Sequence, residues 1–310
     1  MFNREIVSLY GLFTGIIILI LFIFINPPDD LNRAGWITAG IAILMTIWWV
    51  TEAVPIYVTG LIPIVLFPFF NIFDMQDISS SYAHPLVLLF LGGFIIASAM
   101  ESCGLHKRIA INILSFSGTS PAMIIAGFMI TTALISMWVS NTASTIMMLP
   151  IATSVIAIFS SQKQSKENDL TIPLLLAIAY SASIGGIATL IGTPTNVMLA
   201  SILSDNYNYN IGFFDWFKIG FPITLILLPV VWFFLTNIIF KLSKNKSNAL
   251  QVTISNLKKD IGESSFAEKI VAIVFLLTAS LWILRRFINN NFGLNINDTS
   301  IGLFGALLLF

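Results

Sequence analysis

Long runs of apolar residues alternate with short polar joints along most of this 310-residue chain. A helix needs about 20 apolar residues to cross a bilayer, and several of the runs approach that length. The pattern therefore predicts a polytopic membrane protein built from helices. The runs predicted to cross the membrane are Leu12–Ile25, Trp36–Val50, Ile56–Phe70, Gly220–Phe240 and Ile270–Leu284.

The polar stretch Ser136–Thr145 interrupts this pattern in the middle of the chain. The apolar arms on its two sides, about Ala122–Val139 and Ala143–Phe159, are each short for a full crossing. Secondary transporters build midplane sites where a helix breaks inside the membrane. We therefore predict a re-entrant hairpin with a binding site at its tip, which requires Gly118 and Ser160 to lie on the same face of the membrane. The alternative is that these Ser and Thr side chains only pack and hydrogen-bond between helices.

A second interruption follows the helix predicted to begin at Ile172–Tyr180. It contains Ser181–Gly186 and then Gly192–Asn196, where glycine and Pro194 weaken helix continuity. Freed carbonyls near Gly192 could bind a cation, and nearby helix N-termini could face an anion. The alternative is a flexible kink in a packed helix. Two polar interruptions in one apolar half of the chain favour a binding site.

Several polar segments are expected at the edges of the membrane. His84, and His106 with Lys107 and Arg108, are interpreted as interfacial residues, since Lys and Arg side chains can reach the headgroups. Phe213–Trp216 has the composition of an aromatic interfacial anchor. The polar loops are predicted to lie in water, and the lysine-rich one in the cytoplasm by the positive-inside tendency. These loops are Ser160–Asp169, with Lys163, Lys166, Glu167 and Asp169, and Lys241–Glu268, with Lys244 and Lys246.

Composition supports the same class of protein. Apolar residues make up 57% of the chain and charged residues 10%, with a mean hydropathy of +0.92, whereas a soluble domain carries about 25% charged residues. The net charge of zero gives no sign of a nucleic-acid partner. The single cysteine, Cys103, excludes an internal disulfide, and the two histidines lack the spacing of a metal site. No cofactor is predicted.

The last apolar run, Ile301–Phe310, is about 15 Å long as a helix, which is half a bilayer. Short segments resemble each other across the chain: Ile43–Trp49 resembles Phe275–Trp282, and Thr59–Phe67 resembles Ser300–Leu308. Inverted repeats are common in transporters. We therefore expect that a second repeat begins here and that the sequence stops within it.

Four motifs follow one another along the chain: Trp48–Pro55, Phe90–Phe94, Ser136–Thr142, and Ser183–Gly186 with Ile191–Asn196. By these motifs and their order, the chain resembles the divalent anion:sodium symporter family of carboxylate and sulfate carriers. The resemblance extends over essentially the whole chain. Thr195 departs from the family pattern, in which a second proline is usual.

The resemblance implies a binding site for Na⁺ and for one substrate carboxylate. It implies that Na⁺ is held by Ser136, Ser140, Asn141 and Gly192. It implies that the carboxylate contacts Asn141, Thr142, Thr193 and Pro194. These groups carry no positive charge, so bound sodium would supply the counter-charge for a dianionic substrate.

The resemblance also implies an architecture: an inverted-repeat fold in the cytoplasmic membrane, an elevator-like movement, and a homodimer formed through scaffold helices. The second hairpin and second Thr-Pro loop of the family are not found in the sequence, so we expect that the chain holds half a site and does not catalyse coupled uptake alone. The expected organisation is residues 1–81 as scaffold helices, 82–117 as interfacial helices, 118–210 as half of the transport domain, 211–266 as a scaffold helix and cytoplasmic loop, and 267–310 as the start of the second repeat.

Other functions stay open. A related anion carrier could export arsenite or exchange citrate by proton coupling, but such coupling favours ionisable groups at midplane depth, and both polar breaks lack them. An intramembrane protease would need a Ser/His pair or paired aspartates, which the spans do not offer, so an enzyme is not expected. A truncated remnant without transport activity is a further alternative. Succinate, malate, citrate and sulfate all remain candidate substrates.

Overall fold

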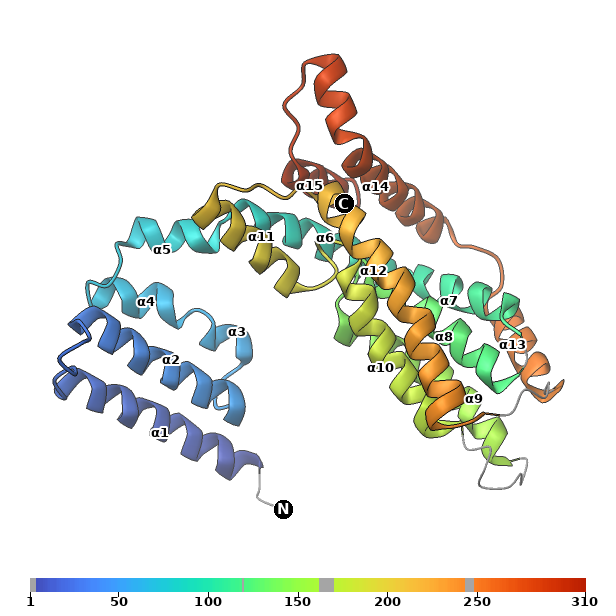
Figure 1. Cartoon of the computed structure of the whole chain (residues 1–310), viewed down its shortest axis with the longest axis horizontal. Coiled ribbons are helices and arrows are strands. Elements are labelled where there is room, and N and C mark those ends of the chain that lie inside the picture. The colour runs from blue at the N-terminus through green and yellow to red at the C-terminus, as the bar shows by residue number, and fades with distance from the viewer. Residues whose placement is uncertain (1–3, 119, 162–169, 243–247) are drawn as a thin grey trace. The chain divides into compact units, whose positions relative to one another are not determined.

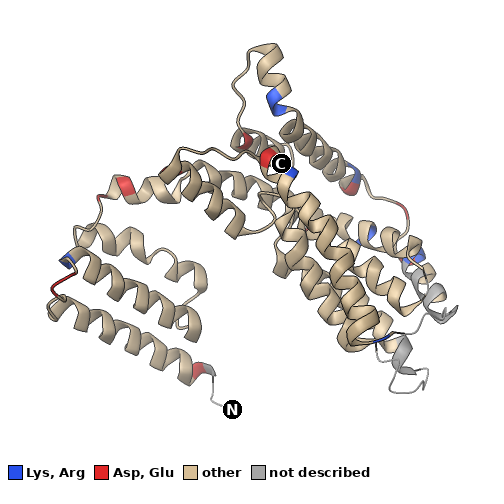
Figure 2. Cartoon of the chain, in the orientation of Figure 1, with Lys and Arg blue, Asp and Glu red and all other residues tan. Residues whose placement is uncertain are grey.

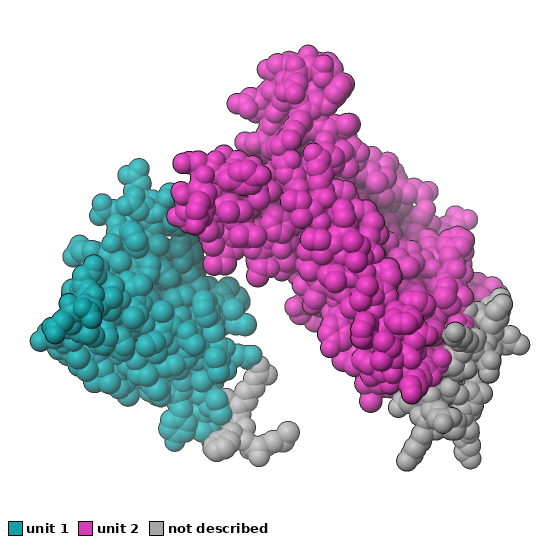
Figure 3. Space-filling model, viewed as in Figure 1, with its two compact units in different colours: residues 1–84 teal, residues 85–310 magenta. Residues whose placement is uncertain are grey.

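The computed structural model describes residues 4–118, 120–161, 170–242 and 248–310. These residues form helices and no strands, which confirms the predicted all-α class. The chain divides into two compact units, residues 1–84 and 85–310 (Figures 1 and 3).

Unit 1 is built on a helical hairpin. Its first two helices pack closely because Gly11 and Gly15 leave room for side chains of the second helix, and Trp48 Nε1 donates to the Leu12 carbonyl at 3.3 Å. Asn32 caps the second helix by accepting from the Gly35 N–H at 2.7 Å. The helices of this unit are α1 (Arg4–Phe24), α2 (Arg33–Thr51), α3 (Ile56–Thr59), α4 (Ile62–Phe69) and α5 (Met75–Tyr82).

The predicted third span, Ile56–Phe70, is wrong as a continuous helix. The structure divides it between α3 and α4, at Gly60 and Leu61. Pro63 lies in the first turn of α4, where a helix tolerates a missing backbone donor. The segment Ile56–Phe69 is accordingly a shorter apolar stretch than a full crossing requires.

Unit 2 contains the two predicted interruptions. Helices α8, α9, α10 and α12 run side by side (Figure 1) around a core that includes Ile124, Phe128, Leu174 and Ile178, each fully buried. The helices of this unit are α6 (Pro85–Ser102), α7 (Leu105–Phe116), α8 (Pro121–Ser136), α9 (Asn141–Ser161), α10 (Thr171–Ile187), α11 (Pro194–Tyr207), α12 (Phe213–Phe233) with its π-helical continuation η2 (Phe234–Ile239), α13 (Asn248–Ile261), α14 (Phe266–Phe292) and α15 (Asp298–Leu307).

Five helical segments of the described chain are long and apolar enough to cross a membrane. Charged residues lie mostly near helix ends and in connections (Figure 2), and α8, α9 and α10 contain none. This distribution agrees with the predicted polytopic membrane protein. The five segments are Glu5–Phe24, Arg33–Thr51, Met75–Ser102, Phe213–Ile239 and Phe266–Phe292.

The predicted interfacial region 82–117 contains helices α6 and α7. Helix α6 belongs to one of the five segments that are long and apolar enough to cross a membrane. Helix α7 is amphipathic, but its apolar side packs on α8, and His106 is buried on it. The His106 ring contacts the Met100 carbonyl at 3.1 Å, so this residue is a hydrogen-bonded core histidine rather than an interfacial one.

Several predicted boundaries nearer the C-terminus also change. Helix α12 begins at Phe213, whose side chain is 1% exposed instead of forming an interfacial anchor. The predicted cytoplasmic loop contains helix α13. Helix α14 continues past Arg285 and Arg286 because both side chains find acidic partners outside the helix. Most of the predicted loop Ser160–Asp169, together with Lys244 and Lys246, lies outside the described residues.

Candidate functional site

The first interruption is a tight helical turn between α8 and α9. The chain leaves α8 at Ser136, and the amides of Met137 and Val139 still donate to carbonyls of its last turn at 3.0 Å. The Ser140 carbonyl accepts the Ser144 N–H at 2.9 Å, while its hydroxyl accepts the Ala143 N–H at 3.3 Å. Ser140 therefore occupies the capping position before α9, a place that favours a short polar side chain.

The second interruption separates α10 from α11. Thr193 precedes Pro194, which stands in the first turn of α11 where its missing N–H costs little. The Asn196 amide donates to the carbonyls of Gly186 and Thr189, each at 2.8 Å. These bonds satisfy backbone acceptors that the broken helix leaves without partners, so Asn196 holds the two sides of the break together.

The two interruptions touch each other. The Ser136 hydroxyl lies 2.7 Å from the Ala182 carbonyl oxygen of α10, and the Thr189 hydroxyl donates to the Met137 carbonyl at the tip. A methyl group on Gly185 would lie 2.4 Å from the Ala133 carbonyl oxygen, so only glycine allows this approach of α10 to α8. The predicted tip and the predicted broken helix thus form one polar region.

Three oxygen atoms converge in this region with one proton among them. Ser136 Oγ lies 2.8 Å from Asn141 Oδ1 and 2.7 Å from the Ala182 carbonyl oxygen. A hydroxyl has a single proton, so Ser136 can donate to only one of the two acceptors. Two arrangements remove the conflict between the Ser136 and Asn141 oxygens. The Asn141 amide can rotate so that its NH₂ group donates to Ser136, or a cation can bind among the oxygens.

Glycine residues connect this oxygen cluster to the α10–α11 break. A methyl group on Gly186 would lie 2.3 Å from Asn141 Oδ1, and one on Gly192 would lie 2.5 Å from the Gly186 carbonyl oxygen. Asn141 therefore packs directly on the Gly186 backbone, which in turn packs on Gly192. Because neither glycine has a side chain, backbone atoms of Gly186 and Gly192 can lie close to the oxygen cluster.

The structure brings some of the predicted site residues together and leaves others apart. Ser136 and Gly192 are buried, and Ser140, Asn141 and Thr193 are half-buried, whereas Thr142 and Pro194 are exposed. Ser136 and Asn141 are in contact, and Gly186 joins them to Gly192. Hydrogen bonds among the described residues do not join Thr142 to Thr193, whose hydroxyl accepts instead from Thr195 at 3.4 Å.

The electrostatics of the region come from neutral groups. The described residues hold no cluster of His, Cys, Asp or Glu that could bind a transition metal. Helices α9 and α11 both begin here, at Asn141 and Pro194, and the N-terminus of a helix favours negative charge. Hydroxyl, amide and carbonyl oxygens favour a hard cation, so the region can accommodate both signs of charge without an ionised side chain.

Four groups that take part in this region were not predicted as site groups: Gly186, Thr189, Asn196 and the Ala182 carbonyl. A signal existed for Asn196, a buried amide in an apolar helix, and for Gly186 in its glycine pair. The Ala182 carbonyl has no signal in the sequence, because any residue provides a carbonyl and only packing selects one.

Comparison with known proteins identifies the family. A model of the citrate transporter family matches residues 46–310. A sodium-dependent dicarboxylate transporter, SdcS, of Staphylococcus saprophyticus is 37% identical over 98% of this chain and 60% of its own length. The SdcS proteins of Staphylococcus aureus strains USA300 and NCTC 8325 are each 35% identical over the same shares.

The chain spans about 60% of the length of these curated relatives. The names of the relatives describe transporters rather than enzymes, and the matches extend across both polar interruptions. The apolar helices agree with this assignment. The chain is therefore a multi-pass integral membrane protein that belongs to the citrate transporter family, which confirms its predicted kinship with the divalent anion:sodium symporters.

Proposed function

We propose that this chain carries one sodium- and carboxylate-binding half-site of a sodium-coupled dicarboxylate carrier. The observation that carries the proposal is the convergence of Ser136, Asn141 and the Ala182 carbonyl around a single hydroxyl proton. The names of the relatives, sodium-dependent dicarboxylate transporters, support the choice of ion and of substrate class.

Sodium is proposed to bind among Ser136, Ser140, Asn141 and the backbone of Gly192. A cation at this position would attract the Asn141 and Ala182 oxygens that compete for one proton. Hard oxygen donors suit Na⁺, and α8, α9 and α10 contain no Asp, Glu, His, Lys or Arg, which argues against proton coupling. Asn141 would then have its oxygen directed to the ion.

The substrate carboxylate is proposed to contact Asn141, Thr142, Thr193 and Pro194. With its oxygen on sodium, the Asn141 amide directs its NH₂ group toward an anion, so one side chain touches both ligands. The starts of α9 and α11 add favourable dipoles. Because sodium and carboxylate attract each other across this residue, each should raise the affinity for the other by the same factor.

Translocation is proposed to be elevator-like, in a homodimer within the cytoplasmic membrane. A dianion has a second carboxylate, and the neutral groups of this region account for only one. We therefore infer that a second set of ligands, beyond this chain, completes the site, and that the 310 residues alone bind sodium without coupled uptake.

The test measures ²²Na⁺ binding to the purified chain. Saturable binding is expected for the wild type, with loss in Asn141→Ala and a clear weakening in Ser140→Ala. Asn112→Ala is the matched control, since it removes an amide from an exposed position of α7. Equal binding by wild type and Asn141→Ala would exclude the sodium site.

The half-site inference is tested separately with the chain in liposomes under an inward sodium gradient. No sodium-driven uptake of labelled succinate is expected. Uptake that disappears in Asn141→Ala would show that the chain transports by itself and would refute the half-site inference.

Citrate is a second candidate substrate, favoured by the description of the family that matches the chain. The carboxylate contacts proposed above serve either compound. Competition distinguishes them: if citrate is the substrate, it should enhance ²²Na⁺ binding at lower concentration than succinate does.

A further inference from the structure

An aromatic cluster surrounds the tip of the hairpin. Trp138 lies between Ser136 and Ser140 in the chain, and its ring centroid is 5.9 Å from that of Phe213, 4.7 Å from that of Phe275 and 6.5 Å from that of Trp282. Phe213 and Trp282 stack on each other at 4.5 Å. Stacked and edge-on aromatic contacts of this kind favour one orientation of the rings, so the cluster restrains the tip.

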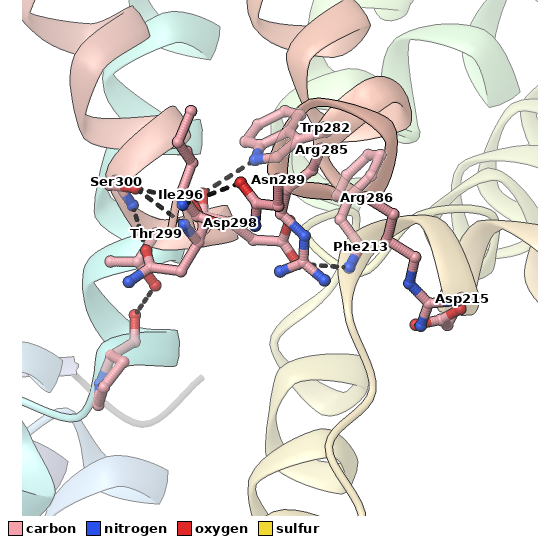
Figure 4. Close-up of polar contacts among 12 residues, drawn as sticks. Phe213, Asp215, Trp282, Arg285, Arg286, Asn289, Ile296, Asp298, Thr299 and Ser300 are labelled. Carbon is pink, nitrogen blue, oxygen red and sulfur yellow. Dashed lines mark hydrogen bonds and ion pairs between the residues drawn. The ribbon is translucent and has the colours of Figure 1, made fainter. Parts of the chain in front are cut away.

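Asp298 connects the two rings that stack beside Trp138 (Figure 4). Its carboxylate accepts the Phe213 N–H at 2.8 Å, and its carbonyl accepts from Trp282 Nε1 at 2.9 Å. Arg285 pairs with the same carboxylate oxygen at 3.0 Å. Asp298 is only 7% exposed, so its contacts are shielded from water and hold the start of α12, the C-terminal half of α14 and the start of α15 together.

The start of α12 also reaches the second interruption. Trp216 Nε1 donates to the Ile187 carbonyl at 2.9 Å, at the end of α10. A methyl group on Gly220 would lie 2.3 Å from the same carbonyl oxygen, so α12 packs closely there. A displaced Phe213 would therefore disturb both the hairpin tip and the break between α10 and α11.

We propose that Asp298 is a positioning residue for the hairpin tip, and that it acts through Phe213 and Trp282 on Trp138. It contacts neither of the proposed ligands. Removal of its carboxylate frees the Phe213 amide and leaves Arg285 without its partner, so the ring stack loosens and Ser136 and Asn141 lose their alignment. The effect on sodium rests on the proposed function; the restraint on the tip does not.

The first test measures amide hydrogen exchange of the full 310-residue chain without sodium. The tip amides of Met137 and Val139 are hydrogen-bonded and report on local opening. In Asp298→Ala these amides should exchange about tenfold faster. The buried α8 amides of Ile124 and Phe128 should stay as slow as in the wild type, which distinguishes local loosening from unfolding.

Matched variants distinguish the effect of the Asp298 hydrogen bond to Phe213 from the effect of losing a negative charge in this region. Asp215→Asn removes a carboxylate of the same charged region, where Asp215 pairs with the exposed Arg286, without touching the ring stack; it should leave the tip amides unchanged. Asp298→Asn keeps an acceptor for the Phe213 N–H and should restore most of the protection. Trp138→Leu removes the ring at the tip and should reproduce the faster exchange with Asp298 intact.

The second test measures ²²Na⁺ binding in the same variants. For a positioning residue, the half-saturating sodium concentration should rise about tenfold in Asp298→Ala, while the amount bound at saturation stays the same. Loss of folded protein would instead lower the amount bound, so the two readouts distinguish positioning from a structural defect.

The outcomes separate this proposal from the proposed function. Tip exchange in Asp298→Ala equal to that in Asp215→Asn would overturn the restraint on the tip, and faster exchange with unchanged sodium affinity would overturn the effect on sodium. If Asp298→Ala unfolds, Trp138→Leu and Asp298→Asn decide it by the same criteria. If the wild type binds no sodium, the proposed function fails, and the restraint on the tip is decided by exchange alone.

Discussion

Gly186 lies where the two polar interruptions touch, and its missing side chain leaves room for the Asn141 amide. A methyl group there would approach Asn141 Oδ1 to 2.3 Å, well inside van der Waals contact. Gly192 leaves room in the same way for the Gly186 carbonyl. At the scale of single residues, the candidate site depends on absent side chains as much as on the polar ones.

Gly186→Ala tests this dependence. Alanine favours a helix over glycine by about 1 kcal/mol, so the isolated helix would gain stability. The new methyl group must nevertheless displace Asn141, and we expect the half-saturating sodium concentration to rise about tenfold or more. ²²Na⁺ binding measures this. Gly60→Ala is the control, because its nearest neighbour would be 3.4 Å away; an equal effect in both variants would contradict the argument.

Arg108 joins three helices at one point on unit 2. Its guanidinium pairs with Glu268 at 2.8 Å and donates to the carbonyls of Gly262 and Glu263, each at 2.9 Å. Glu268 also completes a capping box with Ser265 at the start of α14. At the scale of elements, this contact holds α7 against the connection between α13 and α14. It requires the planar guanidinium group of arginine, which donates several hydrogen bonds at once.

Arg108→Ala should destabilise unit 2 because it leaves the Glu268 carboxylate, 9% exposed, without its partner. A broken buried pair costs about 3–5 kcal/mol; the Arg108 side chain is 19% exposed, so we expect a lower cost, roughly 2 kcal/mol after solvent screening. For a domain of this size that lowers the midpoint of thermal unfolding by about 4–8 °C.

Thermal unfolding in detergent, followed by tryptophan fluorescence, measures the shift. Arg108→Lys should fall between wild type and alanine, since it keeps the charge but not the fork. Lys218→Ala breaks a solvent-exposed pair with Asp215 at 4.0 Å and should change little. A shift in Lys218→Ala as large as that in Arg108→Ala would contradict the role of burial.

The whole molecule combines long apolar helices with two interrupted elements. The 16 residues of α8 and the 17 of α10 are about 24 and 26 Å long at 1.5 Å per residue, each less than the hydrocarbon core. Each therefore ends inside the bilayer if it enters from one face. The predicted arrangement is a hairpin of α8 and α9 that returns to its own face, followed by α10 and α11 crossing together.

This arrangement predicts the sidedness of three positions. In a Cys103→Ser background, Ser115→Cys and Lys163→Cys should react with an impermeant maleimide from the same face of sealed vesicles. Tyr209→Cys, after the exposed end of α11, should react from the opposite face. Labelling of Ser115→Cys and Lys163→Cys from opposite faces would mean that α8 and α9 cross the membrane completely.

The linear pattern of residues was sufficient to predict the helical membrane class and the positions of both interruptions. The length of each apolar run can be read directly from the sequence. The runs are interrupted by residues that are polar or that weaken a helix, namely Ser136, Asn141, Gly192 and Pro194. Helix boundaries were less predictable. Helix α14 continues through Arg285 and Arg286 because these side chains pair with Asp298 at the start of α15 and with Asp215 on α12. A local pattern cannot show such partners.

Which groups meet depends on tertiary packing. His106 and Phe213 are of residue types that are common at membrane interfaces, yet both are buried because neighbouring helices cover them. The Ala182 carbonyl joins Ser136 and Asn141 only because Gly185 lets α10 approach α8. Periodicity and composition describe neighbouring residues in the sequence, whereas a site is formed by residues from different helices. The sequence could therefore indicate the polar breaks but not the atoms that they bring together.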